Sequence, residues 1–223
     1  MSGCMIRTDF QRPAAELITR FRGIPVANID DCMGRIGAAD GLIPIGKGQL
    51  LGCAFTVRVP QGDNLMFHKA MDLAKPGDVV VIDAGGFRDR AILGELMATY
   101  CKRRGLRGIV CDGAIRDRGA LSQMEDFQVY ARAVTPNGPY KNGPGEINVP
   151  VSIGGKVVHP GDIVVGDEDG VIFIPQQLAE TLAAAAEGIE TMEAGYMKQI
   201  VDDGVYLRPW VDEKLKALGC EII

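Results

Sequence analysis

Buried strands and an amphipathic helix alternate through the middle of the chain. The run DVVVID at residues 78–83 is apolar and rich in β-branched residues, which predicts a buried strand. A helix is predicted next, from about residue 92 to 104, with a basic end that favours its dipole. Its apolar positions form one stripe: Leu93, Leu96, Met97 and Tyr100. LRGIVCDG at residues 106–113 predicts a second buried strand, and the βαβ unit so formed implies parallel pairing.

Further elements are predicted on the N-terminal side of that unit. A short helix is expected around residues 17–21, and a second helix opens near Asn28 or Asp30, since both residue types are good caps. CAFTVRVP at residues 53–60 alternates as a strand does. Asp63 and Asn64 are expected to cap a helix that closes before Lys75-Pro76-Gly77.

The second half of the chain has a different pattern. After residue 121, short apolar runs are separated by Gly, Pro, Asn and Asp, which predicts turns and short strands, some of them antiparallel. A long helix is predicted from residue 177 to 201, followed by one more helix. The expected core stripe of the long helix is Leu178, Leu182, Ala185 and Ile189. We therefore predict one compact layered α/β domain over residues 1–223, with an N-terminal helix, a strand-rich second half and a C-terminal helical extension.

Composition excludes several classes of function. Twenty-four Lys and Arg against 29 Asp and Glu give a net charge of −5, whereas a nucleic-acid binder normally carries a basic face. No run of 18 apolar residues occurs, so no membrane span is expected. The six cysteines are scattered without a C-x-x-C pair, which is typical of free thiols in the cytoplasm. Two histidines are too few for a clustered zinc site.

Glycine is abundant, at 29 of 223 residues, or about 13% against an average near 7%. Gly85 and Gly86 separate the predicted strand from the predicted helix, and Gly94 lies near the start of that helix. A helix N-terminus after a glycine-rich loop suits an anion, because its backbone N–H groups are unpaired. Alternatively, the glycine pair only forms a turn and Glu95 is a surface acid near the positive end of the helix dipole.

An Arg-Asp pair follows the second strand of the βαβ unit. Arg116 and Asp117 come where α/β sheets place their ligands, at the carboxyl end of a strand. The planar fork of an arginine can hold a carboxylate or enolate oxygen, and an aspartate is a hard ligand suited to Mg²⁺ or Mn²⁺. The alternative is a surface ion pair with Arg118 or Asp112.

His68 is one turn beyond Asn64 on the same face of a predicted helix. It is either a proton carrier or a packed, hydrogen-bonded core histidine, and the second role is the more common one on an apolar helix. We place Asn64, His68 and Asp112 as residues that support the site rather than contact the ligand directly.

Taken together, these residues resemble the RraA-like family. Residues 94–117 carry its pattern, G-E-L-M-A-x-x-x-x-x-x-G-x-x-G-I-V-x-D-G-A-I-R-D, in which an acidic residue precedes Arg-Asp by twenty intervening positions. Residues 63–83, 142–155 and 159–175 are also similar to family segments, and the likeness runs from about residue 24 to 189. The family includes the class II pyruvate aldolases that cleave 4-hydroxy-4-methyl-2-oxoglutarate.

The resemblance implies an α/β fold of the swivelling β/β/α type, assembled as a homotrimer or homohexamer with active sites at subunit interfaces. It implies that the pyruvate portion of a 2-oxo acid binds the backbone amides of Gly94, Glu95, Leu96 and Met97. Arg116 would then bind the keto or enolate oxygen. Asp117 would hold a divalent metal, Mg²⁺ or alternatively Mn²⁺, with waters completing its shell.

The implied activity is metal-dependent retro-aldol cleavage of a 4-hydroxy-2-oxo acid to pyruvate, with oxaloacetate decarboxylation as a side reaction. A water held by Glu95 would be the base. Characterised aldolases of the family carry Asp where this chain has Glu95, which bears on specificity more than on metal binding. In some members a neighbouring subunit supplies a further acid, for which Glu190 and Glu193 are both candidates here.

A rival interpretation belongs to a different class. The family takes its name from a non-catalytic regulator that inhibits a ribonuclease by protein–protein contact. That regulator lacks the aspartate after the arginine, whereas Asp117 is present in this chain. The presence of Asp117 therefore favours the enzyme.

Overall fold

The computed structural model describes residues 3–221, which fall into two compact units that divide between Ala186 and Glu187. The described strands are β1 (Met5–Ile6), β2 (Ile43–Pro44), β3 (Leu50–Arg58), β4 (Asp78–Leu93), β5 (Gly108–Ile115), β6 (Gln128–Val134), β7 (Glu146–Ile147), β8 (Val151–Ile153), β9 (Lys156–Val158), β10 (Ile163–Gly166) and β11 (Val171–Ile174). The described helices are α1 (Ala15–Thr19), α2 (Val26–Cys32), α3 (Leu65–Leu73), α4 (Glu95–Arg103), α5 (Arg118–Leu121), α6 (Gln176–Asp203) and α7 (Pro209–Ala217).

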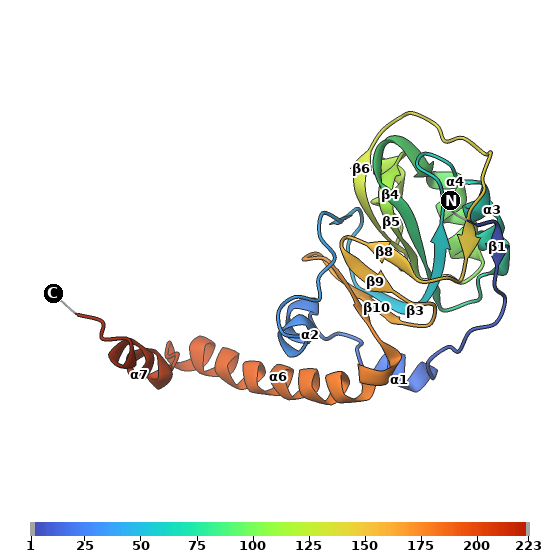
Figure 1. The fold of residues 1–223 in the computed structure, drawn as a ribbon. Coiled ribbons are helices and arrows are strands. Elements are labelled where there is room, and N and C mark those ends of the chain that lie inside the picture. Colours follow the sequence, from blue (N-terminus) through green and yellow to red (C-terminus); the bar gives the residue numbers. More distant parts are fainter. Residues whose placement is uncertain (1–2, 222–223) are drawn as a thin grey trace. The chain divides into compact units, whose positions relative to one another are not determined.

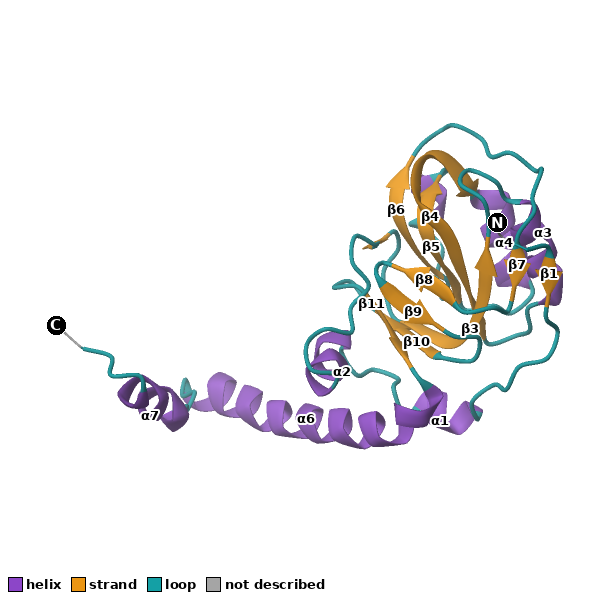
Figure 2. Cartoon of the chain, in the orientation of Figure 1, coloured by secondary structure: helices purple, strands orange, loops and turns teal. Residues whose placement is uncertain are grey.

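A parallel sheet forms the centre of the larger unit. Its order is β1-β7-β3-β4-β5-β6-β2, and β10, which also belongs to this sheet, pairs with the start of β3 and with β11. The pairs β3–β4, β4–β5 and β5–β6 are parallel and are joined by crossovers that contain α3, α4 and α5. The predicted βαβ unit and α/β class are therefore confirmed. Figures 1 and 2 show α3 and α4 on one side of this sheet and the β8–β9 pair on the other.

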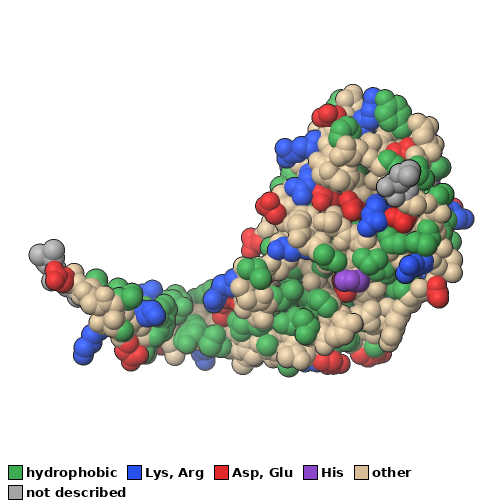
Figure 3. All heavy atoms as spheres, in the orientation of Figure 1, with side chains coloured by type: hydrophobic (Ala, Val, Ile, Leu, Met, Phe, Trp, Pro, Cys, Tyr) green, Lys and Arg blue, Asp and Glu red, His purple; other side chains and the backbone are tan. Residues whose placement is uncertain are grey.

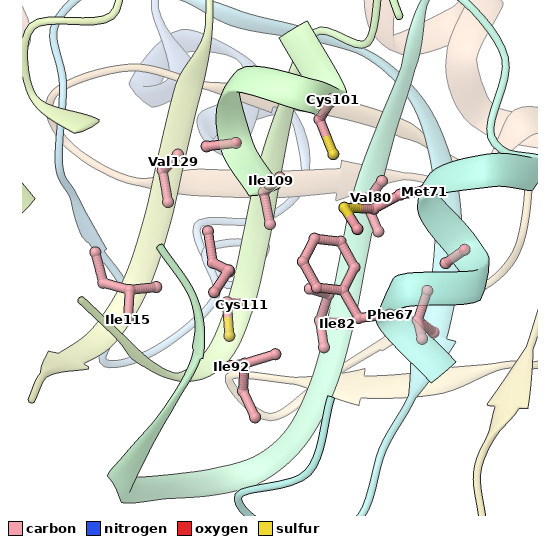
Figure 4. Packing of buried hydrophobic residues seen from close by; sticks show 14 of the residues in the cluster. Phe67, Met71, Val80, Ile82, Ile92, Cys101, Ile109, Cys111, Ile115 and Val129 are labelled. Atoms are coloured by element: carbon pink, nitrogen blue, oxygen red, sulfur yellow. The ribbon is translucent and has the colours of Figure 1, made fainter. Parts of the chain in front are cut away.

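Both faces of the parallel strands are buried, which explains why their sequences are continuous apolar runs. Figure 4 shows the face under α3 and α4, where Phe67 and Met71 pack against Val80, Ile82 and Ile109. Alternate residues of the same strands face the other way and pack against the strands of the second half. A third cluster lies between the β10–β11 pair, the N-terminal helices and the start of α6. The result is a layered α/β unit that holds the strand ends in fixed positions.

One predicted boundary is wrong. Gly85 and Gly86 do not end the strand that begins at residue 78, because β4 continues through them to Leu93. Both glycines have positive φ, at 63° and 69°, and the pairing with β5 shifts register after them. They form a bend within a long strand, which glycine allows at little steric cost. The glycine pair therefore does not lie at the N-terminus of α4.

Two helix faces also differ from their predictions. In α4 the buried residues are Ala98 and Cys101, whereas Leu96 is 84% exposed. In α6 the small residues face the core, and Leu182 is the one predicted stripe residue among those buried. Leu178 and Ala185 are exposed instead. Periodicity alone does not choose between neighbouring apolar faces when alanines can pack closely.

The start of one helix also differs from its prediction. The helix near residue 28 begins after Pro25 rather than at Asn28 or Asp30.

The C-terminal unit starts at Glu187 and contains the distal part of α6 together with α7. Tyr196 and Tyr206 meet edge to face, with ring centroids 5.6 Å apart. Many of its apolar side chains are exposed, including Met197, Val201, Leu207 and Trp210 (Figure 3). Among the helices of the described residues, none is long and apolar enough to span a membrane.

Candidate active site

The carboxyl ends of β4 and β5 lie side by side. Leu93 and Ile115 are the last paired residues of the two strands, and the amide of Arg116 donates to the Leu93 carbonyl at 3.0 Å. Gly94 and Arg116 are therefore neighbours in space although 22 positions apart in sequence. This edge, where parallel strands end and helices begin, is where α/β sheets bind ligands.

A cavity of about 320 Å³ opens at this edge. Its walls come from the end of β4, the first turn of α4, Arg116, α3 and the loop of residues 135–145. Apolar lining predominates, with Ile92, Leu93 and Met97 among the contributors. That volume lies at the lower end of the range typical of small-molecule sites. A second, more open cavity adjoins it and is lined by Arg116, Asp117 and residues 134–136.

The Asp117 carboxylate is fixed at the start of α4. Asp117 has a left-handed backbone, with φ 58° and ψ 35°, and its Oδ2 accepts a hydrogen bond from the Glu95 amide at 3.0 Å. The same oxygen lies 3.6 Å from Nε of Arg116. A Cβ atom on Gly94 would come within 2.3 Å of Asp117 Oδ2 and 2.9 Å of Arg116 Cγ. Glycine at position 94 is thus required for the close approach of Arg116 and Asp117.

The first turn of α4 offers further donors. The amides of Leu96 and Met97 have no acceptor among the residues described, as expected for the N-terminus of a helix. Both residues line the cavity. Together with the guanidinium of Arg116, these amides are hydrogen-bond donors of the kind that suits an anion.

Asn64 and His68 reach the same cavity from α3. The Asn64 side-chain amide donates to the Ile92 carbonyl at 2.9 Å, whereas its Oδ1 is buried without a partner in the described chain. Burial lowers the pKa of His68, and the nearby charge of Lys141 lowers it further, although Asp72 acts in the opposite direction. His68 therefore favours its neutral form and is not enclosed in the core.

Two predicted residues lie apart from the cavity lining. The side chain of Glu95 is exposed and does not contribute to the walls, although its amide holds Asp117. Asp112 is buried on β5, where its carboxylate pairs with Arg132 and accepts the Gly154 amide at 2.9 Å. Within residues 3–221, Arg116 does not pair with Asp112 and Asp117 does not pair with Arg118, which were the alternatives considered from the sequence; Arg116 lies beside Asp117 instead.

Lys141 lines the cavity and was not singled out from the sequence. It belongs to the connection between β6 and β7, whose residues 135–145 have no regular structure. Asp63 anchors this loop by accepting the amides of Asn142 and Gly143, at 2.5 and 3.1 Å. Arg90 donates to the Gly138 carbonyl at 3.0 Å. Binding residues often lie on loops held by a rigid scaffold, and the sequence of this loop carries no periodic pattern that would have singled out Lys141.

The residues present suit a divalent ion that needs few protein ligands. Within residues 3–221 no group of three or more His, Cys, Asp or Glu side chains could enclose a metal. The Asp117 side chain is 42% exposed, and only its Oδ2 is engaged with Glu95. Mg²⁺ commonly binds one or two carboxylates and keeps several waters. Asp117 therefore fits such an ion as its single protein ligand.

Comparison with known proteins finds a matching family model and similar relatives. The family model of RraA-like proteins, described as Aldolase/RraA, matches residues 26–173. A protein of Halalkalibacterium halodurans is 39% identical over 202 residues, which cover 90% of this chain and 96% of that protein. Its name is "Putative 4-hydroxy-4-methyl-2-oxoglutarate aldolase".

Solved structures show the same fold. An uncharacterised protein from Pseudomonas syringae superposes with a TM-score of 0.79 at 24% identity, over 88% of this chain and 98% of that one. Streptomyces coelicolor RraAS2, described as an unusual member of the RNase ES inhibitor RraA protein family, superposes with a TM-score of 0.75 at 27% identity. That likeness covers 85% of this chain and all of RraAS2.

Proposed function

This chain belongs to the RraA-like family, and we propose that it is a divalent-metal-dependent lyase that releases pyruvate from a 4-hydroxy-2-oxo acid by retro-aldol cleavage. The observation that carries the proposal is the meeting of Arg116, Asp117 and the first turn of α4, where Arg116 lines two cavities and Asp117 lines the second of them. The aldolase name of a relative at 39% identity supports it. We propose 4-hydroxy-4-methyl-2-oxoglutarate as a substrate and oxaloacetate decarboxylation as a side reaction.

Some residues of the chain bind the substrate, and Arg116 also stabilises the negative charge that develops during the reaction. The free amides of Leu96 and Met97 bind the 2-oxo acid end of the substrate, and Arg116 holds the 2-oxo oxygen. When the C3–C4 bond breaks, its electron pair passes to C3 and onto that oxygen, and the charge that develops there is stabilised by the guanidinium. Donors aimed at developing charge lower the barrier without rearrangement at the moment of reaction.

The proton of the C4 hydroxyl needs an acceptor. Glu95 lies between two residues that line the cavity, Gly94 and Leu96, and its carboxylate is exposed. We assign the base as a water that this carboxylate holds. The water removes the proton of the C4 hydroxyl as the C4 carbonyl forms. Oxaloacetate decarboxylation leaves the same pyruvate enolate, so the same residues serve both reactions.

Asp117 is the residue that would hold the metal, with Mg²⁺ proposed ahead of Mn²⁺. When bound, the ion polarises the carbonyl of the substrate as a Lewis acid. The left-handed backbone of Asp117 and its hydrogen bond from the Glu95 amide orient the carboxylate before any ligand arrives. Such preorganisation is expected of a residue that touches the reacting groups.

We propose assembly as a homotrimer or homohexamer with the sites at subunit interfaces. Exposed apolar side chains near the cavity support this: Leu65, Leu96 and Tyr140 are 41%, 84% and 51% exposed. The exposed apolar residues of the C-terminal unit add to them. In this assembly Glu190 or Glu193 of a neighbouring subunit would supply a further acid. A cytoplasmic location is also proposed, supported by the free state of all six cysteines.

A ribonuclease regulator is the second candidate, and the similarity to RraAS2 favours it. The two functions differ in what they require of the cavity. An aldolase should gain thermal stability when Mg²⁺ and oxalate, a mimic of the pyruvate enolate, are added together, because ligands of the folded state raise Tm. A regulator that acts only through protein contacts should show no joint effect.

A further inference from the structure

A separate, polar cavity lies at the opposite edge of the parallel sheet from the candidate active site. Its volume is about 240 Å³, and its lining residues are Arg22, Gln49, Leu51, Arg107 and Asp126. Leu51 is in β3, Arg107 directly precedes β5, and Asp126 lies two positions before β6, so the cavity is at the edge where these strands begin. The eight residues of β5, which rise roughly 25 Å, separate this cavity from Arg116.

Two arginines of this cavity have no partner in the part of the chain that the structure describes. The guanidinium groups of Arg22 and Arg107 make no hydrogen bond, ion pair or ring contact within residues 3–221. By contrast, Arg12, Arg58 and Arg132 each pair with a carboxylate. Two positive charges on the walls of one cavity repel each other unless an anion lies between them. The two arginines therefore suit an anion that both of them contact.

The backbone that carries each arginine is held in place. Gln49 fixes the turn that contains Arg22, because its Oε1 accepts the Gly23 amide at 2.9 Å. Its Nε2 donates to two carbonyls of the same turn, at 3.1 and 3.2 Å. The Arg107 amide donates to the Asp78 carbonyl at 2.9 Å. Since neither segment has to be ordered by a ligand, binding costs less entropy.

Asp126 adds one acceptor to the same cavity. Its carboxylate also lacks a partner within residues 3–221. A carboxylate repels a ligand that is anionic throughout, whereas it accepts hydrogen bonds from hydroxyl groups. The planar fork of an arginine matches the oxygens of a phosphate group. The lining therefore suits a ligand with a phosphate at one end and hydroxyl groups beyond it.

We propose that this cavity binds a small phosphate monoester that carries hydroxyl groups. The phosphate contacts the guanidinium groups of Arg22 and Arg107, and Asp126 accepts a hydrogen bond from a hydroxyl of the ligand. None of these three residues lines the cavity beside the first turn of α4. The inference is consequently independent of the proposed lyase activity.

Isothermal titration calorimetry of the full-length protein tests the inference, in a phosphate-free buffer without divalent metal. The probes are glycerol 3-phosphate, glycerol and propyl phosphate, which share a three-carbon chain. The wild type should bind glycerol 3-phosphate saturably and should not bind glycerol. Propyl phosphate lacks the hydroxyls and should bind more weakly by roughly tenfold, the loss of one hydrogen bond to a charged group. No saturable binding of glycerol 3-phosphate up to about 10 mM, or equal affinity for propyl phosphate, would overturn the inference.

Two variants test the arginines. Arg22→Met and Arg107→Met should each weaken the binding of glycerol 3-phosphate by roughly ten- to hundredfold, because each removes a charge-assisted hydrogen bond. Both side chains are exposed and unpaired in the described chain, so Tm should remain that of the wild type. Arg103→Met is the matched control, since Arg103 is exposed at the end of α4 and does not line the cavity. Wild-type affinity in both Arg22→Met and Arg107→Met would overturn the inference.

Two further variants test the acceptor and the location of the site. Asp126→Ala should bind glycerol 3-phosphate and propyl phosphate with equal affinity, because the acceptor for the hydroxyl is removed. Arg116→Ala removes the guanidinium of the candidate active site and should leave the Kd of glycerol 3-phosphate unchanged. Loss of binding in Arg116→Ala together with full binding in Arg107→Met would place the phosphate in the candidate active site and overturn the inference.

Discussion

Asp117 Oδ2 accepts a hydrogen bond from the backbone amide of Glu95 at 3.0 Å. This contact joins the second residue after β5 to the first residue of α4, and it places a carboxylate beside the free amides of Leu96 and Met97. Asp117 consequently has two roles, as the cap of a helix and as the proposed metal ligand. Those roles can be separated by substitution.

Asp117→Asn should keep the cap and lose the metal. An asparagine side-chain oxygen can still accept from the Glu95 amide, so Tm should remain within about 2 °C of the wild type, whereas a neutral amide is a poorer ligand for Mg²⁺. Asp117→Ala removes the cap as well and should cost about 1 kcal/mol of unfolding free energy. Thermal denaturation with and without Mg²⁺ and oxalate checks both variants. A full Mg²⁺ response in Asp117→Asn would contradict the assignment of Asp117 as ligand.

Gly94→Ala should lower activity strongly while the protein still folds. The added Cβ would lie 2.3 Å from Asp117 Oδ2 and 2.9 Å from Arg116 Cγ, so both side chains must move. We expect kcat/KM for pyruvate release to fall by roughly a hundredfold, since small displacements of positioned groups are that costly.

Gly119→Ala is the matched control for this substitution. Gly119 lies in α5, and a Cβ there meets nothing within 4 Å. Its activity should therefore match that of the wild type. If Gly94→Ala is as active as Gly119→Ala, the geometry described for Arg116 and Asp117 is not required for catalysis.

The sequence predicted the order of elements well where burial dominates. The apolar runs of β4 and β5 and the helix between them were recovered, because a strand covered on both faces has a continuous apolar pattern. The extent of β4 was not predicted. A glycine pair usually ends a strand, whereas Gly85 and Gly86 only bend this one. The continuation of β4 beyond the bend depends on its pairing with β5. This pairing is a tertiary contact, so no local sequence pattern predicts it.

His68 should make the stability of the protein depend on pH. Its pKa in the folded state lies below the ordinary 6.5, mainly through burial and then through Lys141. The unfolded chain therefore takes up a proton at a higher pH than the folded one, and stability from this residue is present above pH ~6.5 and lost as the pH falls further. Tm of the wild type should thus drop relative to His68→Gln between about pH 7 and pH 5.

NMR can observe the same group directly. Only two histidines occur, so a His159→Gln variant assigns the ring signals. Lys141→Met should raise the pKa of His68, because one of the charges that lowers it is removed. An unchanged pKa would show that Lys141 does not lie near His68 in solution.

Arg132 should stabilise the fold without taking part in the chemistry. Its guanidinium pairs with the buried carboxylate of Asp112, so Arg132→Met should cost about 3 kcal/mol by leaving a buried charge. The exposed pair of Arg35 and Asp31 is the control, and Arg35→Met should cost less than about 1 kcal/mol. Chemical denaturation measures both. Equal losses would contradict the structural role assigned to Asp112.

The structure brings together only some of the residues that the sequence predicts for the site. Gly94, Arg116 and Asp117 are close in space because Leu93 pairs with Ile115, although the sequence pattern placed Leu93 in the following helix. Asp112 was placed near the ligand because it is close in sequence, yet its position on β5 directs it to Arg132. Lys141 was missed because the path of the loop is set by hydrogen bonds to Asp63, not by any periodicity.

The most direct test of the proposed function is pyruvate release from 4-hydroxy-4-methyl-2-oxoglutarate with Mg²⁺ or with EDTA, measured for the wild type, Arg116→Ala and Asp117→Ala. The wild type should release pyruvate only with the metal. Each variant should be slower by roughly a hundredfold or more, the loss expected when a group that stabilises developing charge is removed. Tm of each variant should show that it remains folded. Wild-type rates in either variant, or release that EDTA does not affect, would contradict the account.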